Sequence, residues 1–159
     1  MDIPEEIEIS LVRADEYPAV AALRWEWESE GGVKPFGDPD TFAKEFAEWA
    51  LRNADTYRCI VVRRNGTVIG MAWLVVVARV PVPGNMSRAG GDLQSMYVSA
   101  QAQGRGFGSR LLAAVFDEAR RLDLKKVVVQ ATSGSMAFYG RNGFSDAPKI
   151  LQAKLRAKL

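Results

Sequence analysis

The feature that most restricts the fold of this 159-residue sequence is a glycine-rich loop between a strand pattern and a long helix pattern. The strand is expected over residues 92–98, the helix over 104–122, and a second, valine-rich strand over 125–132. Two strands that are joined by a helix in one sheet pair in parallel, through a right-handed crossover. The chain is therefore predicted to be an α/β protein built around residues 92–132.

The other strand patterns are expected to pair antiparallel. Residues 7–11 alternate apolar and polar side chains, which is typical of a half-buried strand. Two runs rich in Val and Ile, 57–64 and 67–78, are separated by Asn65-Gly66, the strongest short signal for a β-hairpin. Residues 151–159 also alternate strictly and are predicted to form a C-terminal strand, although a helix would group Leu151, Leu155 and Leu159 as well.

Helix signals surround these strands. Asp15 is placed to cap a first helix that runs to about Glu30 and ends at Gly31-Gly32. On that helix Trp27 fits the core-facing stripe, and Trp25 is left to reach a cleft, a subunit contact or solvent. A second helix is expected over 40–52 and a short one over 135–142, with Gly143 just past its end. Residues 79–91 are expected to form a loop.

Composition excludes several classes of protein. Lys and Arg number 21 against 19 Asp and Glu, and no long run of like charge predicts a nucleic-acid surface. The absence of His, with Cys59 as the single cysteine, excludes His-dependent triads, a disulfide framework and a cysteine-based zinc site, so no metal is expected. The longest apolar run, 70–78, is half a membrane span, and the acidic N-terminus is unlike a signal peptide. A cytoplasmic, single-domain protein over 1–159 is expected.

The glycine loop is predicted to bind an anion. In Gln103-Gly-Arg-Gly-Phe-Gly-Ser109 the glycines allow a tight turn that presents successive N–H groups next to the free donors of a helix N-terminus. Arg105 adds positive charge, and a pyrophosphate suits such a site. The alternative is a glycine turn that only begins a helix. The spacing is not that of a dinucleotide-binding fingerprint, and the terminal Gly-Lys-Ser/Thr of a Walker A loop is missing.

Two motifs give the chain a resemblance to a known family. Residues 96–108, MYVSAQAQGRGFG, resemble the signature of the GNAT N-acetyltransferase superfamily: an apolar strand, a short connection, then Gln/Arg-x-x-Gly-x-Gly/Ala opening a helix. About thirty residues later, FYGRNGF at 138–144 is similar to the family's Phe-Tyr-x-x-x-Gly-Phe. The order of elements over about residues 7–159 also resembles that of the family.

The resemblance implies a fold and a co-substrate. The fold is a mixed, mostly antiparallel sheet whose two central parallel strands, 92–98 and 125–132, splay apart in a V, with helices on both faces. Acetyl-CoA lies in that V, its pyrophosphate on backbone N–H groups of the glycine loop and its pantetheine along backbone groups of Met96 and Val98. The residues to which the resemblance assigns cofactor contacts are Met96, Tyr97, Val98, Gln103, Gly104, Arg105, Gly106, Phe107, Gly108, Ser109, Thr132, Phe138 and Arg141.

Thr132 and Ser135 depart from the family pattern, since many members have Asn and Ala at these two positions. Ala100 likewise stands where a proline is often found. Thr132 can still form a hydrogen bond, so the first substitution is expected to weaken cofactor binding without abolishing it.

The resemblance also implies the catalytic roles. Tyr139 stands where family members commonly have the acid that protonates the departing thiolate, and a phenol can supply that proton at close range. The alternative interpretation is that Tyr139 is a core tyrosine without a catalytic role. The amine must be neutral to attack, and Asp92 is the candidate base, with Glu26, Glu28 and Glu30 as alternatives. Each of these carboxylates is also compatible with a merely solvated position.

The expected function is N-acetyl transfer from acetyl-CoA to a primary amine by direct attack in a ternary complex. A small-molecule acceptor is expected, and acidic residues near the mouth of the site would favour a cationic one such as a polyamine, an aminoglycoside or a lysine side chain. A catalytically inactive acyl-CoA-binding module is the main alternative, and a nucleotide-phosphate-binding domain is a third. A homodimer through loops and helix faces is expected, because the charged edge of the tail strand resists pairing. Neither a nucleic-acid nor a membrane partner is expected.

Overall fold

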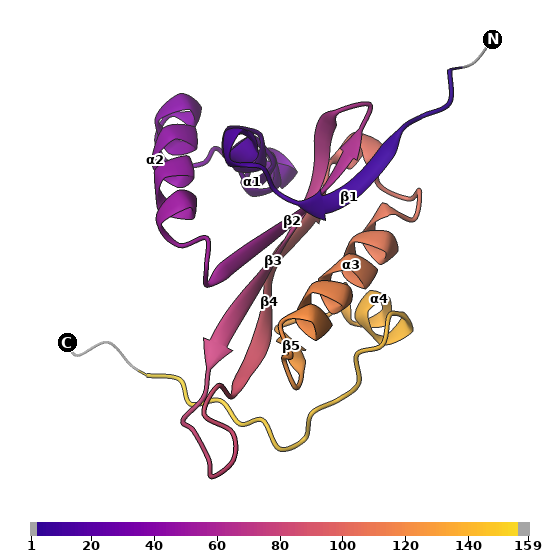
Figure 1. The fold of residues 1–159 in the computed structure, drawn as a ribbon. Helices are drawn as coiled ribbons and strands as arrows, with labels where there is room; N and C mark the ends of the chain where they lie inside the picture. Colours follow the sequence, from indigo (N-terminus) through magenta and orange to yellow (C-terminus); the bar gives the residue numbers. More distant parts are fainter. Residues whose placement is uncertain (1–2, 156–159) are drawn as a thin grey trace.

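The computed structural model describes residues 3–155, and in this part of the chain five strands form one sheet (Figure 1). Neighbouring strands in the first four positions are antiparallel, and the last pair is parallel. The strands, in sheet order, are β1 (Ile7–Leu11), β2 (Tyr57–Arg64), β3 (Thr67–Ala78), β4 (Ala89–Val98) and β5 (Val127–Val129).

Helices cover both faces of this sheet. The first two lie on one face and the last two on the other, as Figure 1 shows. This arrangement confirms the predicted mixed α/β fold. The helices are α1 (Tyr17–Glu28), α2 (Pro39–Arg52), α3 (Phe107–Arg121) and α4 (Met136–Arg141), and short 3-10 turns occur at η1 (Ala14–Glu16), η2 (Glu30–Gly32) and η3 (Ala100–Ala102).

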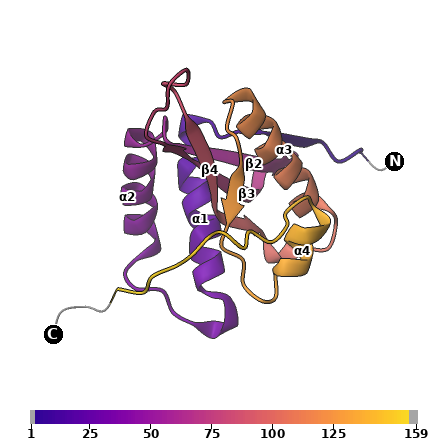
Figure 2. The same cartoon turned by 90° about the horizontal axis from the view of Figure 1, so that it is seen from below.

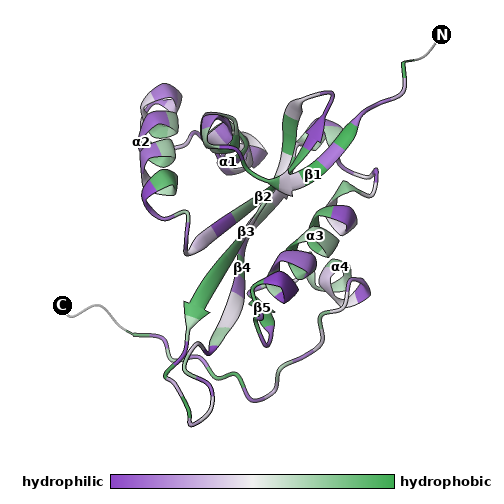
Figure 3. Ribbon diagram, in the orientation of Figure 1, coloured by the Kyte–Doolittle hydropathy of each residue, from purple (hydrophilic) through white to green (hydrophobic). Residues whose placement is uncertain are grey.

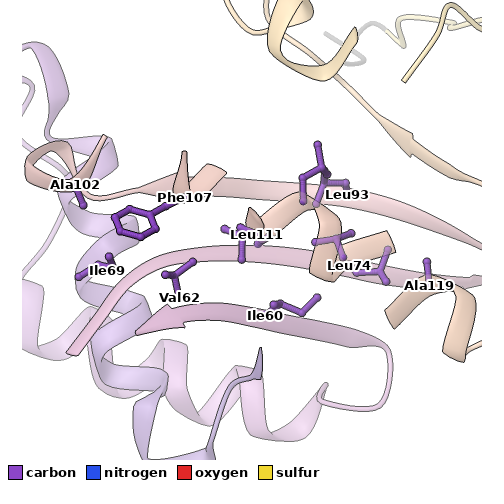
Figure 4. Close-up of a cluster of buried hydrophobic side chains, with 12 residues drawn as sticks. Ile60, Val62, Ile69, Leu74, Leu93, Ala102, Phe107, Leu111 and Ala119 are labelled. Atoms are coloured by element: carbon purple, nitrogen blue, oxygen red, sulfur yellow. The ribbon is translucent and has the colours of Figure 1, made fainter. Parts of the chain in front are cut away.

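The sheet separates two hydrophobic clusters, because successive side chains of a strand point to opposite faces. On β2, Ile60 and Val62 pack beneath α3, whereas Cys59 and Val61 pack beneath α1 and α2. Figure 4 shows the α3 side, and Figure 3 shows that much of β3, which is paired on both edges, is hydrophobic. The buried residues of α3 that complete the first cluster are Phe107, Leu111, Leu112, Val115 and Ala119.

Local turn chemistry explains several boundaries. Asn65 and Gly66 both adopt positive φ, 50° and 79°, as a two-residue hairpin turn of type I′ requires. The Asp38 carboxylate accepts a hydrogen bond from the Thr41 N–H at 2.9 Å and caps α2. At the end of α4 the Phe144 N–H donates to the Tyr139 carbonyl around Gly143, whose φ is 100°.

Some predicted boundaries are wrong. Asp15 does not cap α1: it lies in η1, and α1 begins two residues later. β4 begins at residue 89, so the preceding loop is shorter than predicted, because residues 89–91 pair with 76–78 of β3. α3 begins only at Phe107, since Gly104 and Gly106 have positive φ. β5 has three residues, far fewer than the predicted 125–132.

The predicted C-terminal strand is not formed in residues 151–155, and residues 156–159 lie outside the described part of the chain. The segment after α4 instead runs back across the end of the sheet (Figures 1 and 2). Within residues 3–155, β5 is therefore the edge strand, and the parallel pair lies at the edge of the sheet rather than at its centre. The homodimer stays a prediction.

A buried arginine joins β2 to the start of the first helix. Arg63 is 1% exposed, and its guanidinium donates to the Glu16 carboxylate, to Ser10 Oγ at 2.7 Å and to the Leu11 carbonyl at 3.1 Å. The hydrogen bond from Arg63 holds the pKa of the Glu16 carboxyl below its usual value. The ion pair therefore contributes stability above about pH 4.3, and that contribution is lost as the pH falls through the lowered pKa.

Replacing Arg63 with Met should lower the free energy of unfolding by about 3–5 kcal/mol at pH 7, because Glu16 is left charged without its main partner. Urea unfolding measures this change. The matched control is the double variant with Glu16→Leu as well, which removes both charges and should recover most of the loss. Equal stability of Arg63→Met and the parent would show that the pair contributes nothing.

Candidate active site

An extra residue in β4 shapes the region between β4 and β5. Trp73 of β3 faces Gln94 and Met71 faces Tyr97, so two steps along β3 correspond to three along β4. Ser95 has a φ of 52°, which marks the bulged position. Bulges bend a strand and end regular pairing. The parallel pairing with β5 accordingly covers only Gly91–Leu93 on β4.

A cleft of about 370 Å³ lies along this region. Backbone and side chains of β4 form one wall, and the residues from the end of β5 to the start of α4 form the other. The predicted acid, Tyr139, and the predicted base, Asp92, both line it. Its lining residues are Trp27, Asp92, Leu93, Gln94, Ser95, Met96, Val129, Gln130, Thr132, Ser135 and Tyr139.

Tyr139 projects from α4 among aromatic rings. The ring of Phe138 lies 5.2 Å from it and that of Phe144 5.4 Å, both edge-on. Burial raises the pKa of Tyr139 above its usual value near 10. The hydroxyl therefore keeps its proton throughout the neutral range, as a proton donor must.

Asp92 is half-buried on β4 and lies on the α1 side of the sheet, because its neighbours Gly91 and Leu93 point toward α3. One carboxylate oxygen, Oδ2, accepts a hydrogen bond from Gln94 Nε2 at 2.8 Å. The other oxygen makes no hydrogen bond within residues 3–155. A carboxylate held in this way can accept a proton from a group in the cleft.

The glycine loop presents a row of backbone donors beyond the end of β4. Gly106 precedes α3 in the left-handed conformation and provides no side-chain cap. From residue 104 to 109, no N–H group donates to an acceptor of the described chain. A Cβ at residue 104 or 106 would meet nothing within 4 Å, so the loop is open on that side. The arrangement fits an anion such as a pyrophosphate.

The side chains of this loop have other partners. The Gln103 amide Nε2 donates to the Val98 carbonyl at 2.8 Å and folds the loop against the end of β4. Arg105 pairs with Glu5 at 2.9 Å, so its charge is shared with the N-terminal segment. Phe107 is 5% exposed, because its side chain packs in the core. A cofactor could reach only its backbone N–H.

Gly108 lies where α3 packs closely against α4. A Cβ at this position would lie 3.3 Å from Phe138 Cζ. Phe138 thus packs over the start of α3, while Thr132 lines the cleft and lies 3.1 Å from Ser135, oxygen to oxygen. Arg141 is exposed at the end of α4, and Ser109 is exposed in the first turn of α3.

Tyr97, like Phe107, does not line the cleft. Its ring is buried on the α1 side and stacks on Trp27 at 5.4 Å, whereas Met96 and Val98 pack on the α3 side. Its hydroxyl lies 2.9 Å from a Glu30 oxygen and 3.2 Å from a Glu26 oxygen. Burial and these two carboxylates raise the pKa of Tyr97.

The alternative bases, Glu26 and Glu28 on α1 and Glu30 in η2, have structural roles. The Glu26 carboxylate accepts hydrogen bonds from Ser99 Oγ and from the Ala100 N–H, both at 3.0 Å, and so ties α1 to the end of β4. Glu28 pairs with Arg24. Glu26, Glu28 and Glu30 do not line the cleft, which leaves Asp92 as its carboxylate.

Both tryptophans of α1 pack against other aromatic rings. Trp27 packs on the α1-side core cluster, as its place in the stripe predicted, and also lines the cleft, whereas Trp25 packs on Phe42 of α2 at 5.8 Å. Sequence analysis also missed Gln94, Ser95 and Gln130 as lining residues. Only the alternation of β4, which places Gln94 on the same face as Asp92, could have indicated one of them.

Among residues 3–155, no group of three or more acidic or cysteine side chains is placed to hold a metal ion. In the same part of the chain, every helix is too short or too polar to cross a membrane.

Comparison with known proteins identifies the family. Residues 19–144 match the acetyltransferase (GNAT) family. The chain is a member of the GNAT family. This GNAT protein is 33% identical over 94 residues to an IAA acetyltransferase of Azospirillum brasilense, an alignment that covers 56% of this chain and 55% of the relative. The match therefore spans about half the length of that curated relative.

Solved structures share the fold over nearly the whole chain. A predicted acetyltransferase with acetyl-CoA from Clostridium acetobutylicum has a TM-score of 0.74 and 17% identity, covering 94% of this chain and 96% of the other. An aminoglycoside N-acetyltransferase in complex with CoA has a TM-score of 0.73 and 17% identity, covering 99% of both chains. At these identities the likeness concerns the fold.

Proposed function

We propose that this GNAT protein transfers the acetyl group of acetyl-CoA to a primary amine by direct attack in a ternary complex. The observation that carries the proposal is the cleft beside the short β4–β5 pair, which is lined by both Tyr139 and Asp92. The row of free N–H groups from residue 104 to 109 supports binding of the pyrophosphate. Solved structures of the same fold contain acetyl-CoA or CoA, which supports the choice of co-substrate.

The residues of the chain would divide the chemistry as follows. Asp92 takes a proton from the acceptor amine, whose nitrogen forms a bond to the thioester carbonyl carbon as the carbon–sulfur bond breaks. Tyr139 gives its proton to the departing sulfur, because a thiol with a pKa near 8.5 leaves as a thiolate. Acetyl-CoA supplies the activated acyl group. Trp27 and Met96 line the cleft with apolar surface.

The proposal is tested by steady-state release of CoA thiol with a panel of primary amines. Acetyl-dependent turnover, with mass-spectrometric detection of the N-acetylated amine, would support the proposed function. The alternative is a catalytically inactive acyl-CoA-binding module. CoA binding by calorimetry without turnover on any amine would favour that alternative.

Replacing Asp92 with Asn should lower turnover with an amine acceptor by about 10²-fold at pH 7, because the variant cannot accept the proton. Asn keeps an oxygen that can accept the hydrogen bond from Gln94, so the cleft should keep its shape. The loss should shrink at high pH, where more of the amine is already neutral. Asp55→Asn, an exposed substitution between α2 and β2, is the control. A loss that does not change with pH would argue against the role of Asp92 as base.

A further inference from the structure

A second cavity, of about 470 Å³, adjoins the cleft, and several basic residues are among those that line it. Asp92, Val129 and Gln130 line both the cleft and this second cavity, so the cleft and the cavity meet at Asp92, the predicted base. The loop between β3 and β4 and the turn before β5 form the walls, and Ile150 of the C-terminal segment covers one side. The basic lining residues are Arg79, Arg88, Lys125 and Lys126.

Backbone hydrogen bonds hold the segments that carry these basic residues close to the start of β4. The Arg79 N–H donates to the Arg88 carbonyl at 2.8 Å, which closes the β3–β4 loop at its base. The Gly91 N–H donates to the Lys126 carbonyl, also at 2.8 Å, and fixes the lysine turn beside the same strand. Arg88 is half-buried and donates from Nη1 to the Val80 carbonyl at 3.3 Å. Gly90 lines the cavity without a side chain and leaves its floor open.

The charge of this cavity contrasts with that of the chain as a whole. The full sequence has a net charge of only +2, yet four cations and one carboxylate line this cavity. Lys125 lies 3.4 Å from Asp123, but within residues 3–155 neither arginine nor Lys126 forms an ion pair. Cations gathered in a partly enclosed cleft raise the local concentration of anions and disfavour a second positive charge.

We propose that the acceptor is a primary amine that also carries an anionic group, a carboxylate or a phosphate. The inference rests on the proposed function. The amine would lie at Asp92, where the cleft and the cavity meet, and the anionic group would lie among Arg79, Arg88, Lys125 and Lys126. This charge pattern is opposite to the one that a polyamine or an aminoglycoside requires, and it replaces the sequence-based expectation of a cationic acceptor.

Three six-carbon amines test the charge preference on one scaffold: 6-aminohexanoate, its neutral carboxamide 6-aminohexanamide, and the cationic 1,6-diaminohexane. The amine that reacts is almost equally basic in the first two, because five carbons separate it from the group that changes. O-phosphoethanolamine against ethanolamine tests phosphate in the same way. Each probe is titrated calorimetrically into the CoA-bound protein and also assayed for turnover with acetyl-CoA.

The expected result is that each anionic amine binds about 10- to 100-fold more tightly than its neutral partner, and that the diamine binds most weakly. In the double variant Arg79→Gln/Arg88→Gln, the preference for the anionic amine over its neutral partner should fall about 10-fold or more. In the turnover assay the change should be in KM rather than kcat, and the Kd for CoA should stay the same. Arg52→Gln, an exposed arginine at the end of α2, controls for the change in net charge.

The outcomes separate the two proposals. Equal binding of anionic and neutral partners, or an unchanged ratio in the double variant, would overturn the inference and leave the proposed function intact. Tighter binding of the diamine would also overturn the inference, would leave the proposed function intact, and would favour a cationic acceptor. Tight binding of the anionic probes without turnover of any amine would support the anion site but overturn the transferase. A preference shown by only one of the two anions would identify the group, carboxylate or phosphate, that the acceptor carries.

Discussion

Tyr139→Phe should turn over an amine acceptor about 10²- to 10⁴-fold more slowly than the parent, while its affinity for CoA changes little. Phenylalanine keeps the ring and its edge-on contacts with Phe138 and Phe144, so only the proton donor is lost. Because that proton is needed mainly in the transition state, kcat and kcat/KM should fall together. Rates of thiol release and calorimetric titration with CoA measure the two quantities.

Tyr57→Phe is the matched control for this experiment. Tyr57 is also half-buried and also packs edge-on against an aromatic ring, that of Trp49 at 4.9 Å, but it lies on β2, away from the cleft. Its loss of a hydroxyl should leave turnover within about twofold. If Tyr139→Phe turned over like the parent under conditions where chemistry limits the rate, the proton would have to come from solvent or substrate. Tyr139 would then be a packing residue beside the cofactor.

Gly106→Glu should abolish measurable binding of CoA. The new carboxylate would stand beside the N–H groups that are expected to hold the pyrophosphate, and it would repel the phosphates. No atom lies within 4 Å of a Cβ at this position, so the side chain enters the open space of the expected phosphate site rather than the core. Calorimetry with CoA measures the affinity.

Gly106→Ala separates charge from backbone strain in this test. Gly106 has a φ of 82°, and any L residue there costs about 1–2 kcal/mol, whether Ala or Glu. The two variants should therefore lose similar stability, but only Glu should lose all CoA affinity. Thermal unfolding of both variants shows that they are folded. A folded Gly106→Glu protein that binds CoA like Gly106→Ala would show that the glycine loop does not hold the phosphates.

The parts of the fold that local chemistry decides were predictable from the sequence. The hairpin at Asn65-Gly66, the end of α4 at Gly143 and the stripe of α3 each depend on a few neighbouring residues. Pairing between distant segments was less predictable. β5 pairs with β4 only ahead of the bulge and is short, and residues 151–155 alternate but do not pair with the free edge of β5. Alternation indicates what a strand could bury, but it does not provide the partner.

The same distinction applies to the site. The family resemblance assigned Tyr139 and Asp92 to one site, and both line the cleft. Neither motif nor periodicity could predict that Trp27 would line the cleft as well as pack on the core, or that Arg105 would pair with Glu5, which is 100 residues away. Ser95 offered no signal either, since serine rarely adopts a positive φ.

The extra residue in β4 divides the strand into two halves of opposite side-chain phase. Before the bulge, even-numbered positions such as Asp92 and Gln94 face α1; after it, Met96 and Val98 face α3 and Tyr97 faces α1. An unbroken strand would have put Tyr97 under α3 and Met96 under α1. One inserted residue thus lets a single strand direct Asp92 and Gln94 to the α1 side along its first half, and Met96 and Val98 to the α3 side along its second.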